Sequence, residues 1–101
     1  MAGQKFDQDK PMFDLVDPWF HEELAQVLTH GANKYKPNNW QKVKNAKSRY
    51  IAALERHVNA FKKGEINDPE SGLSHMAHVA CNAMFLHYLE KINENRNRKG
   101  N

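Results

Sequence analysis

The apolar positions along the chain predict three helices. One is expected from Asn45 to Lys63, where apolar residues recur three and four positions apart, the spacing of an amphipathic helix. An earlier helix is expected from about residue 18 to about residue 35, because Asp17 can cap it and proline is favoured at the first helical position. A third is expected from near Glu70 to about residue 93. The apolar positions of the middle helix are Tyr50, Ile51, Leu54, Val58 and Phe61.

The segments outside these helices show no strand pattern, so the fold class is expected to be all-α. Residues 1–16 lack a helical period and contain Pro11, which keeps the preceding residue extended, so they predict an extended N-terminal arm. Residues 94–101 predict a frayed basic tail. We therefore expect one domain over residues 1–101, a compact bundle of three main helices with an arm.

The third helix has more than one face that is unsuited to water, which is typical of a buried helix. A chain of 101 residues leaves a large fraction of its surface in water. We therefore expect a second subunit to cover the extra face, so that the bundle is completed by homo-oligomerisation, as a dimer or higher.

Composition excludes several classes of function. The formal net charge of +3 comes largely from the tail, where Arg96, Arg98 and Lys99 stand against Glu94, so we expect no nucleic acid partner. The single cysteine, Cys81, excludes an intrachain disulfide. No stretch reaches the roughly 18 uninterrupted apolar residues of a membrane span and no signal peptide is recognisable, so we expect no membrane partner and a cytoplasmic location.

Two histidines in the third helix are the first candidates for chemistry. His75 and His78 lie three positions apart, on one helix face, with Asn82 further along the same stripe. They can bind a metal or phosphate oxygens, or they can be satisfied core residues; a polar strip in an apolar core favours the functional reading. The preceding connection adds Glu65 and Asp68, carboxylates that suit hard cations, although such residues also occur as ordinary helix caps.

Basic and aromatic residues elsewhere predict a nucleotide site. Arg49 and Arg56 are one heptad apart and can meet phosphate, but solvated arginines are equally compatible with this spacing. Two lysines and an indole flank the turn after the first helix and can hold phosphate and base, although the indole can also be a core anchor. These residues are Lys34, Lys36 and Trp40. His57 is expected to be half-buried and to approach the third helix.

Three stretches of the chain resemble the N-terminal domain of phage-encoded dATP/dGTP diphosphohydrolases, near the all-α MazG-like pyrophosphatases. The stretches are KFDQDKPMFDLV, HEELAQVLTHGANKYKPNNW and ALERHVNAFKKGEINDPESGLSHMAHVACNAMFL. The most specific piece is G-E-x-x-D-x-E-S-G-L-x-H-x-A-H at 64–78. The resemblance implies that a purine deoxynucleoside triphosphate is cleaved to the monophosphate and pyrophosphate by water, with a divalent metal assisting. It also implies that residues 5–10 of the arm can fold over the ligand.

The chain departs from the acidic clusters of the wider MazG type. Glu22 and Glu23 match the start of an E-E-x-x-E run whose later glutamate is missing, and His75 and His78 stand at the spacing of an E-x-x-D pair. Mg²⁺ or Mn²⁺ is expected as cofactor, with Co²⁺ or Zn²⁺ also compatible because imidazole suits transition metals. The alternative is a non-catalytic protein that sequesters a nucleotide, for example a phage counter-defence sponge for a nucleotide signal.

The resulting site prediction has two parts. The catalytic residues are expected to be Glu23, Glu65, Asp68, His75 and His78, with Glu22 joining them as a metal ligand and His57 next in rank. The residues expected to bind phosphate or base are Lys34, Lys36, Trp40, Arg49, Arg56 and Asn82. A purine nucleotide is the expected partner, in the cytoplasm of an infected bacterial host if the protein is phage-encoded.

Overall fold

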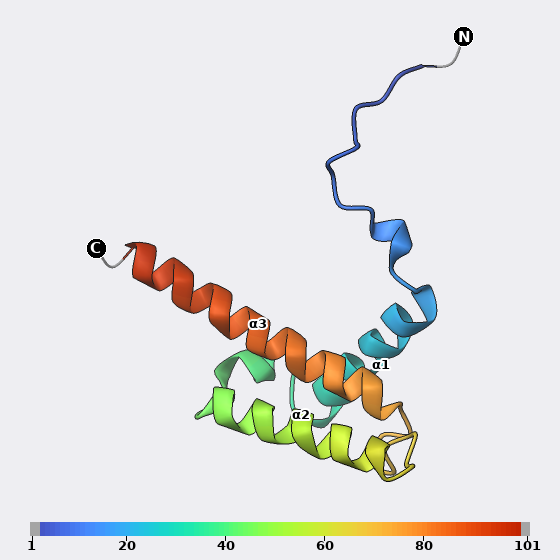
Figure 1. Cartoon of the computed structure of the whole chain (residues 1–101). Helices are drawn as coiled ribbons and strands as arrows, with labels where there is room; N and C mark the ends of the chain where they lie inside the picture. The colour runs from blue at the N-terminus through green and yellow to red at the C-terminus, as the bar shows by residue number, and fades with distance from the viewer. Residues whose placement is uncertain (1–2, 100–101) are drawn as a thin grey trace.

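The computed structural model describes residues 3–99 and consists of helices and their connections (Figure 1). The α-helices are α1 (Pro18–Lys34), α2 (Ala46–Lys62) and α3 (His75–Lys99). Two short 3-10 helices, η1 (Phe13–Leu15) and η2 (Asn39–Lys42), lie in the arm and between α1 and α2. Residues 3–99 contain no strand, only an isolated antiparallel bridge between Asn67 and Ser74. The prediction of an all-α fold with three main helices is confirmed.

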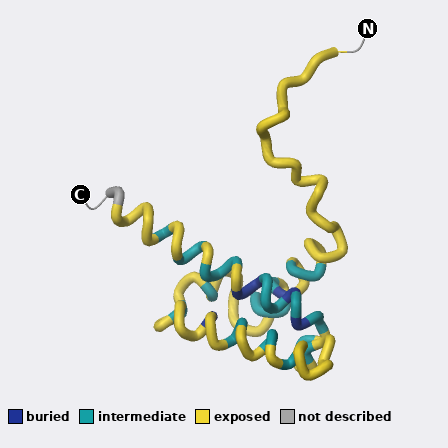
Figure 2. Tube along the Cα trace, in the orientation of Figure 1, coloured by how far each residue is buried: buried dark blue, intermediate teal, exposed yellow. Residues whose placement is uncertain are grey.

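Helix α3 is the centre of the fold, because both α1 and α2 pack against it (Figure 1). The buried apolar cluster consists of Val27 of α1 with Ala77 and Cys81 of α3. Partly buried leucines and Phe85 surround this cluster. Figure 2 shows that the buried positions gather on α3 near α1, while most of the molecule is exposed. The core is therefore small and lies at one end of α3.

The ends of α1 and α2 follow their capping residues. The Asp17 side chain accepts a hydrogen bond from the Trp19 amide at 3.3 Å, with Pro18 at the first helical position, as the sequence predicts. Helix α2 ends at Lys62, with Lys63 as its C-cap, and the following Gly64 takes φ +99°. A left-handed glycine ends a helix at low steric cost, so this boundary is also confirmed.

Helix η2 is fixed to α3 by aromatic contacts. The Trp40 ring stacks on Phe85, with centroids 4.5 Å apart, and meets Tyr88 edge-on at 4.8 Å. The Tyr50 hydroxyl donates a 2.6 Å hydrogen bond to the Trp40 carbonyl. Trp40 thus acts as the packing anchor that holds the connection between α1 and α2 against α3.

Both predicted ends of the third helix are wrong. It begins at His75 instead of near Glu70, because residues 65–74 form a closed loop bridged at Asn67 and Ser74. It continues to Lys99 instead of ending at about residue 93, so residues 94–99 of the predicted tail are helical; residues 100–101 lie outside the described residues, and fraying of the tail stays a prediction. No glycine or proline interrupts this stretch, and a Lys91–Glu94 ion pair at 3.4 Å supports it.

The N-terminal arm leads away from the helices (Figure 1). The described part of the arm, residues 3–16, is exposed throughout and contains the 3-10 turn η1, which the sequence analysis did not anticipate. Residues 1–2 of the predicted arm lie outside the described residues. The extended arm is confirmed, apart from η1 and a turn in which the Lys10 amide donates to the Asp7 carbonyl at 3.1 Å; the folding of residues 5–10 over a ligand stays a prediction.

Two glycines provide a matched test of these helix boundaries. Gly64→Ala is expected to lower the free energy of unfolding by about 1–2 kcal/mol, because alanine is strained at this positive φ. Gly31→Ala, inside α1 where an added Cβ meets no atom within 4 Å, is expected to raise it by about 0.5–1 kcal/mol. Urea unfolding followed by circular dichroism measures both; equal effects of the two substitutions would contradict the assignment.

Candidate functional site

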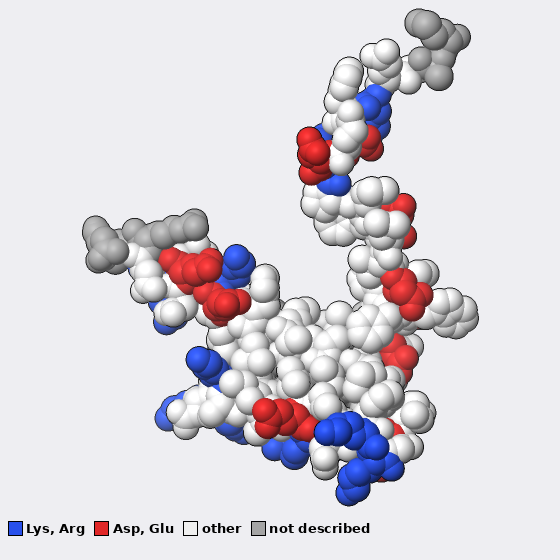
Figure 3. Space-filling view, viewed as in Figure 1, with Lys and Arg blue, Asp and Glu red and all other residues white. Residues whose placement is uncertain are grey.

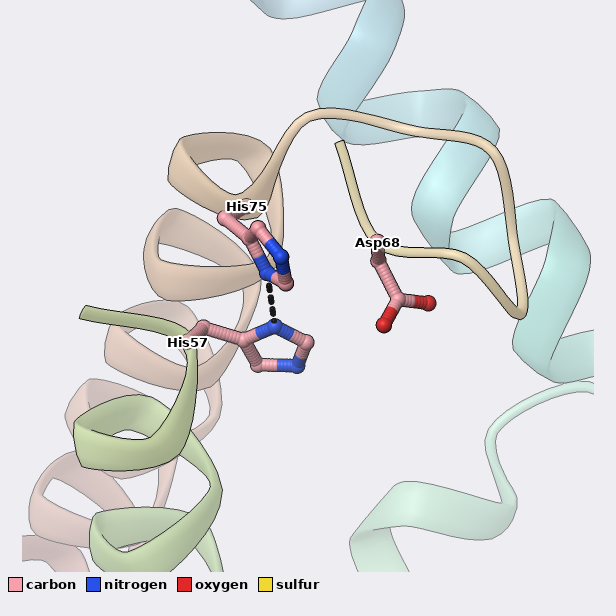
Figure 4. A group of neighbouring side chains, drawn as sticks. All are labelled: His57, Asp68 and His75. Carbon is pink, nitrogen blue, oxygen red and sulfur yellow. Dashed lines mark hydrogen bonds between the residues drawn. The ribbon is translucent and has the colours of Figure 1, made fainter. Parts of the chain in front are cut away.

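Three ligand-type side chains from three parts of the chain meet beside the start of α3. His57 comes from α2, Asp68 from the connecting loop and His75 from the first turn of α3 (Figure 4). One donor atom of each lies within 4.8 Å of the others. The Nδ1 atoms of His57 and His75 are 2.8 Å apart, in hydrogen-bonding contact. We call these three residues the His–Asp cluster.

Glu65 determines which nitrogen of His75 faces the cluster. Its Oε1 lies 2.7 Å from Nε2 of His75, whose side chain is 3% exposed. A carboxylate can only accept a hydrogen bond, so Nε2 of His75 carries a proton and donates it to Glu65. In the neutral imidazole, the lone pair of His75 is then on Nδ1, which points at His57.

His78 contacts this cluster but is not one of its three residues. Its ring stacks on that of His57, with centroids 4.4 Å apart and an interplanar angle of 8°. Its Nε2 is in hydrogen-bonding contact with the Ser71 hydroxyl at 2.7 Å and lies 3.9 Å from a carboxylate oxygen of Asp68. His78 therefore supports His57 and borders the carboxylate of the cluster.

The loop between α2 and α3 positions Asp68 through its own hydrogen bonds. The Asp68 carboxylate accepts a hydrogen bond from the Ser71 amide at 2.9 Å, and the Asp68 carbonyl accepts one from Gly72 at 2.7 Å. The Asp68 amide donates to the Leu73 carbonyl at 2.8 Å, which closes the loop. Gly72 takes φ +75°, a conformation that favours glycine. The turn thus directs a carboxylate toward the histidines.

Burial and neighbouring charges shift the pKa values of His57, His78 and Asp68 in the direction that favours cation binding. Burial, followed by the neighbouring His78 and His75, lowers the pKa of His57, and burial likewise lowers the pKa of His78 although Asp68 opposes it. Burial works to raise the pKa of Asp68, but hydrogen bonds from Ser71 and the nearby histidines outweigh it, so this pKa is lowered. Neutral imidazoles and an ionised carboxylate are the forms that bind cations.

A groove of about 1150 Å³ lies between α1, α2 and α3. His78 lines the groove and stacks on His57, so the groove borders the His–Asp cluster, although none of the three cluster residues lines it. Basic side chains reach the groove from α2 and from the connection before it, and Figure 3 shows basic residues gathered over α2. The predicted binding residues that line the groove are Lys36, Trp40, Arg49, Arg56 and Asn82.

The side chains of the groove differ in how free they are to bind a ligand. Arg49 and Arg56 are exposed, whereas Asn82 is buried and its amide nitrogen donates to the His78 carbonyl at 2.9 Å. One face of the Trp40 ring is covered by Phe85. The groups available to an anion are therefore Arg56, Lys36 and Arg49, although the Arg49 guanidinium also donates to the Lys44 carbonyl at 3.5 Å.

Four predicted residues lie elsewhere or have other contacts. Lys34 pairs with Glu70 and does not line the groove; the hydrogen bond from Lys34 lowers the pKa of Glu70. The Glu23 carboxylate accepts a hydrogen bond from the Ser74 amide at 2.7 Å, so it ties α1 to the start of α3. Glu22 is exposed on α1 and is not part of the cluster. Glu65 contacts His75 but is not one of the three clustered donors.

Two residues matter more in the structure than in the sequence analysis. His57, ranked behind the others, is at the centre of the cluster. Ser71 was not considered, yet it contacts both Asp68 and His78. The Glu-Ser-Gly turn was a signal for Ser71, since serine beside glycine commonly makes side-chain contacts in turns.

The fold and the site together define an all-α domain with a histidine–carboxylate cluster at the end of a basic groove. The chain belongs to the family described as dATP/dGTP diphosphohydrolase, N-terminal, whose model matches residues 1–99. This confirms the resemblance on which the sequence analysis drew.

A curated relative agrees with this family. The chain is 45% identical over 89 residues to a dATP/dGTP diphosphohydrolase of Salmonella phage PMBT28. The match covers 88% of this chain and 30% of the relative, so the chain spans less than a third of that protein's length. No solved structure matches the chain, and the MazG-like comparison stays a prediction. Among the described residues, no helix is long and apolar enough to cross a membrane.

The thiol in the groove wall offers a test of the packing around the site. Burial raises the pKa of Cys81 to about 12. Since the thiolate is the reactive form, Ellman's reagent at pH 8 is expected to react at least on the order of 100-fold more slowly with native protein than with protein in urea. Cys81 is the only cysteine, so Cys81→Ala provides the blank. Rapid reaction of the native protein would contradict its burial against Val27 and Ala77.

Proposed function

We propose that this domain binds a purine deoxynucleoside triphosphate and contributes to its metal-dependent hydrolysis to the monophosphate and pyrophosphate. In this reaction water attacks the α-phosphorus, and the bond to the oxygen that bridges the α- and β-phosphates breaks. The observation that carries the proposal is the adjacency of the basic groove and the His–Asp cluster, since His78 lines the groove and stacks on His57. The name of the phage relative supports the substrate class. The phage source of this relative also favours action on the nucleotide pool of an infected bacterial host.

The groove has the chemistry that a nucleoside triphosphate requires. Arg49 and Arg56 can bind phosphate oxygens through two parallel N–H groups, and Lys36 adds a further positive charge. The walls around them include apolar and aromatic side chains that suit a purine ring. The volume of about 1150 Å³ is at the upper end of small-ligand sites, sufficient for a nucleotide.

The His–Asp cluster is the part of the chain that would hold a divalent cation. His57, Asp68 and His75 offer two nitrogens and one carboxylate, a donor set that fits such an ion. A bound cation supplies charge neutralisation at the phosphates and lowers the pKa of a water molecule. The residues of the chain bind and orient the triphosphate beside it: the arginines hold the phosphates and the groove walls restrict the base.

Arginine substitutions test this proposal. Arg56→Ala and Arg49→Ala are each expected to weaken nucleotide binding about 10-fold or more, since a hydrogen bond to a charged group contributes ~1.5–3 kcal/mol. Arg96→Ala removes the same charge from the exposed far end of α3 and is expected to leave binding unchanged. The purified chain is incubated with each deoxynucleoside triphosphate and Mg²⁺, Mn²⁺ or Co²⁺, products are separated by chromatography, and affinity is measured by calorimetry.

The product analysis separates hydrolysis from the sequestering alternative. Monophosphate and pyrophosphate in equal amounts support the proposed reaction. Nucleotide that is bound tightly but recovered intact would contradict hydrolysis and support the sequestering function. If wild type, Arg49→Ala and Arg56→Ala bind nucleotide with equal affinity, the groove is not the nucleotide site for either hydrolysis or sequestration.

We also propose that two copies of the chain assemble through the arm and the start of α1. The chain exposes 8418 Å², whereas a compact monomer of 11.7 kDa exposes about 5900 Å². The difference exceeds the ~800 Å² that each partner buries in a standard interface. Large apolar side chains are concentrated there: Trp19 is 80% exposed, Phe13 81% and Leu15 75%. A second copy, arranged about a two-fold axis, is the occupant that covers this surface on both chains at once.

Light scattering coupled to size-exclusion chromatography tests the assembly. Wild type is expected at twice the 11.7 kDa chain mass. The double variant Phe13→Glu with Trp19→Glu is expected at the monomer mass, because burying the new carboxylates in an apolar interface is unfavourable. Tyr35→Glu, at a side chain 61% exposed outside the arm, is the control and is expected to stay dimeric. A monomeric wild type would refute the proposal.

A further inference from the structure

We propose that the His–Asp cluster is a transition-metal site in which His57, His75 and Asp68 are the ligands and Glu65 is the positioning residue. The inference deepens the proposed function, on which its catalytic meaning rests, but the metal site itself is argued from geometry. It differs from the sequence prediction in three ways: His57 becomes a ligand, Glu65 and His78 support ligands instead of binding the metal, and Glu22 and Glu23 lie outside the cluster.

The first argument is the position of the two imidazole nitrogens. Nδ1 of His57 and Nδ1 of His75 are 2.8 Å apart. Two nitrogens on a tetrahedral zinc ion, each at about 2.0–2.1 Å from it, lie about 3.3 Å apart. A separation of the rings by about half an ångström, with the proton of neutral His57 moved from Nδ1 to Nε2, therefore converts the hydrogen-bonded pair into a pair of ligands that each present a lone pair on Nδ1. Asp68 completes the set, because its donor oxygen is within the same 4.8 Å group.

The second argument is the carboxylate behind His75. Metal-binding histidines commonly donate their other ring N–H to a carboxylate, which fixes the tautomer and the ring orientation. Glu65 has this relation to His75, at 2.7 Å from Nε2. His75 is 3% exposed, so a buried imidazole is oriented toward the cluster by the half-exposed carboxylate of Glu65. This arrangement points to a ligand for Nδ1.

The third argument is the choice of donor atoms. Mg²⁺ prefers oxygen ligands in an octahedral arrangement, whereas imidazole suits zinc and other late transition metals. Two nitrogens and one carboxylate oxygen therefore favour such ions over Mg²⁺. Three protein ligands leave a coordination position for a water or phosphate oxygen, as in catalytic sites. His78 contributes ring stacking on His57, and its Nε2 is in hydrogen-bonding contact with Ser71.

The experiment measures metal binding without nucleotide, on full-length chain purified without a histidine tag. Zn²⁺, Co²⁺, Mn²⁺ and Mg²⁺ are titrated separately by calorimetry, and the visible absorption of bound Co²⁺ reports its coordination. Wild type is expected to bind one Zn²⁺ or Co²⁺ per chain and to bind Mg²⁺ much more weakly. His57→Ala and Asp68→Asn are each expected to weaken Co²⁺ binding by more than about 100-fold. In Asp68→Asn the side-chain oxygen still accepts the hydrogen bond from the Ser71 amide, so the loop is expected to stay folded. This variant therefore tests the metal site even if His57→Ala fails to fold.

Glu65 and an exposed histidine complete the variant set. Glu65→Ala is expected to weaken Co²⁺ binding by about 10- to 100-fold and to shift its absorption spectrum, because His75 is no longer oriented. Glu65→Gln, which still accepts the hydrogen bond from His75, is expected to restore part of this loss. His87→Ala removes an exposed histidine of α3 and is expected to bind Co²⁺ like wild type.

The outcomes distinguish this inference from the proposed function. No transition-metal binding by wild type, equal binding by folded Asp68→Asn, or equal weakening by His87→Ala would overturn the metal site. Hydrolysis that is supported by Mg²⁺ and unaffected by Asp68→Asn, together with no Zn²⁺ or Co²⁺ binding, would overturn the metal site and leave the hydrolysis to a cation held elsewhere on the chain. Stoichiometric Co²⁺ binding without nucleotide hydrolysis would support the metal site and contradict the proposed hydrolytic function.

Discussion

The structure depends on the closed loop between α2 and α3. A helix that continued through residues 70–74 would carry Asp68 away from the histidines, but hydrogen bonds within residues 66–74 end the irregular segment sharply at His75. Glu23 reinforces this end by accepting the Ser74 amide from a different helix. One turn therefore sets the start of α3, docks α1, and brings the carboxylate of Asp68 to the two imidazoles.

Local sequence determined much of the fold but not this loop. The caps of α1 and α2, Asp17 and Gly64, act within a few residues of their own helices, so they are readable from sequence. The start of α3 depends on a bridge between Asn67 and Ser74 and on the long-range contact with Glu23. Asp68 before Pro69 resembles a helix start, and only the competing loop hydrogen bonds exclude that reading.

The site was predictable to the extent that one helix face carried it. His75, His78 and Asn82 share a stripe of α3, and the structure keeps them together on the packed side of that helix. His57 and Ser71 join them through packing between elements, which periodicity does not report. Lys34 was predicted to bind phosphate on the same grounds as Lys36. The loop that carries Glu70 approaches α1, so Lys34 forms an ion pair with Glu70 and does not line the groove.

The distribution of burial also favours a binding site over a purely structural core. In the described part of the chain only Val27, Tyr50, Ala77 and Cys81 are buried apolar residues, while two of the buried positions of α3 are the polar His75 and Asn82. Buried polar groups contribute less stability than apolar packing, even when they are hydrogen-bonded. Placing polar His75 and Asn82 on the most buried face of α3 therefore adds little to the stability of this small chain. The polar groups are satisfied by Glu65, His57 and the His78 carbonyl, which maintains an ordered cluster at the end of the groove.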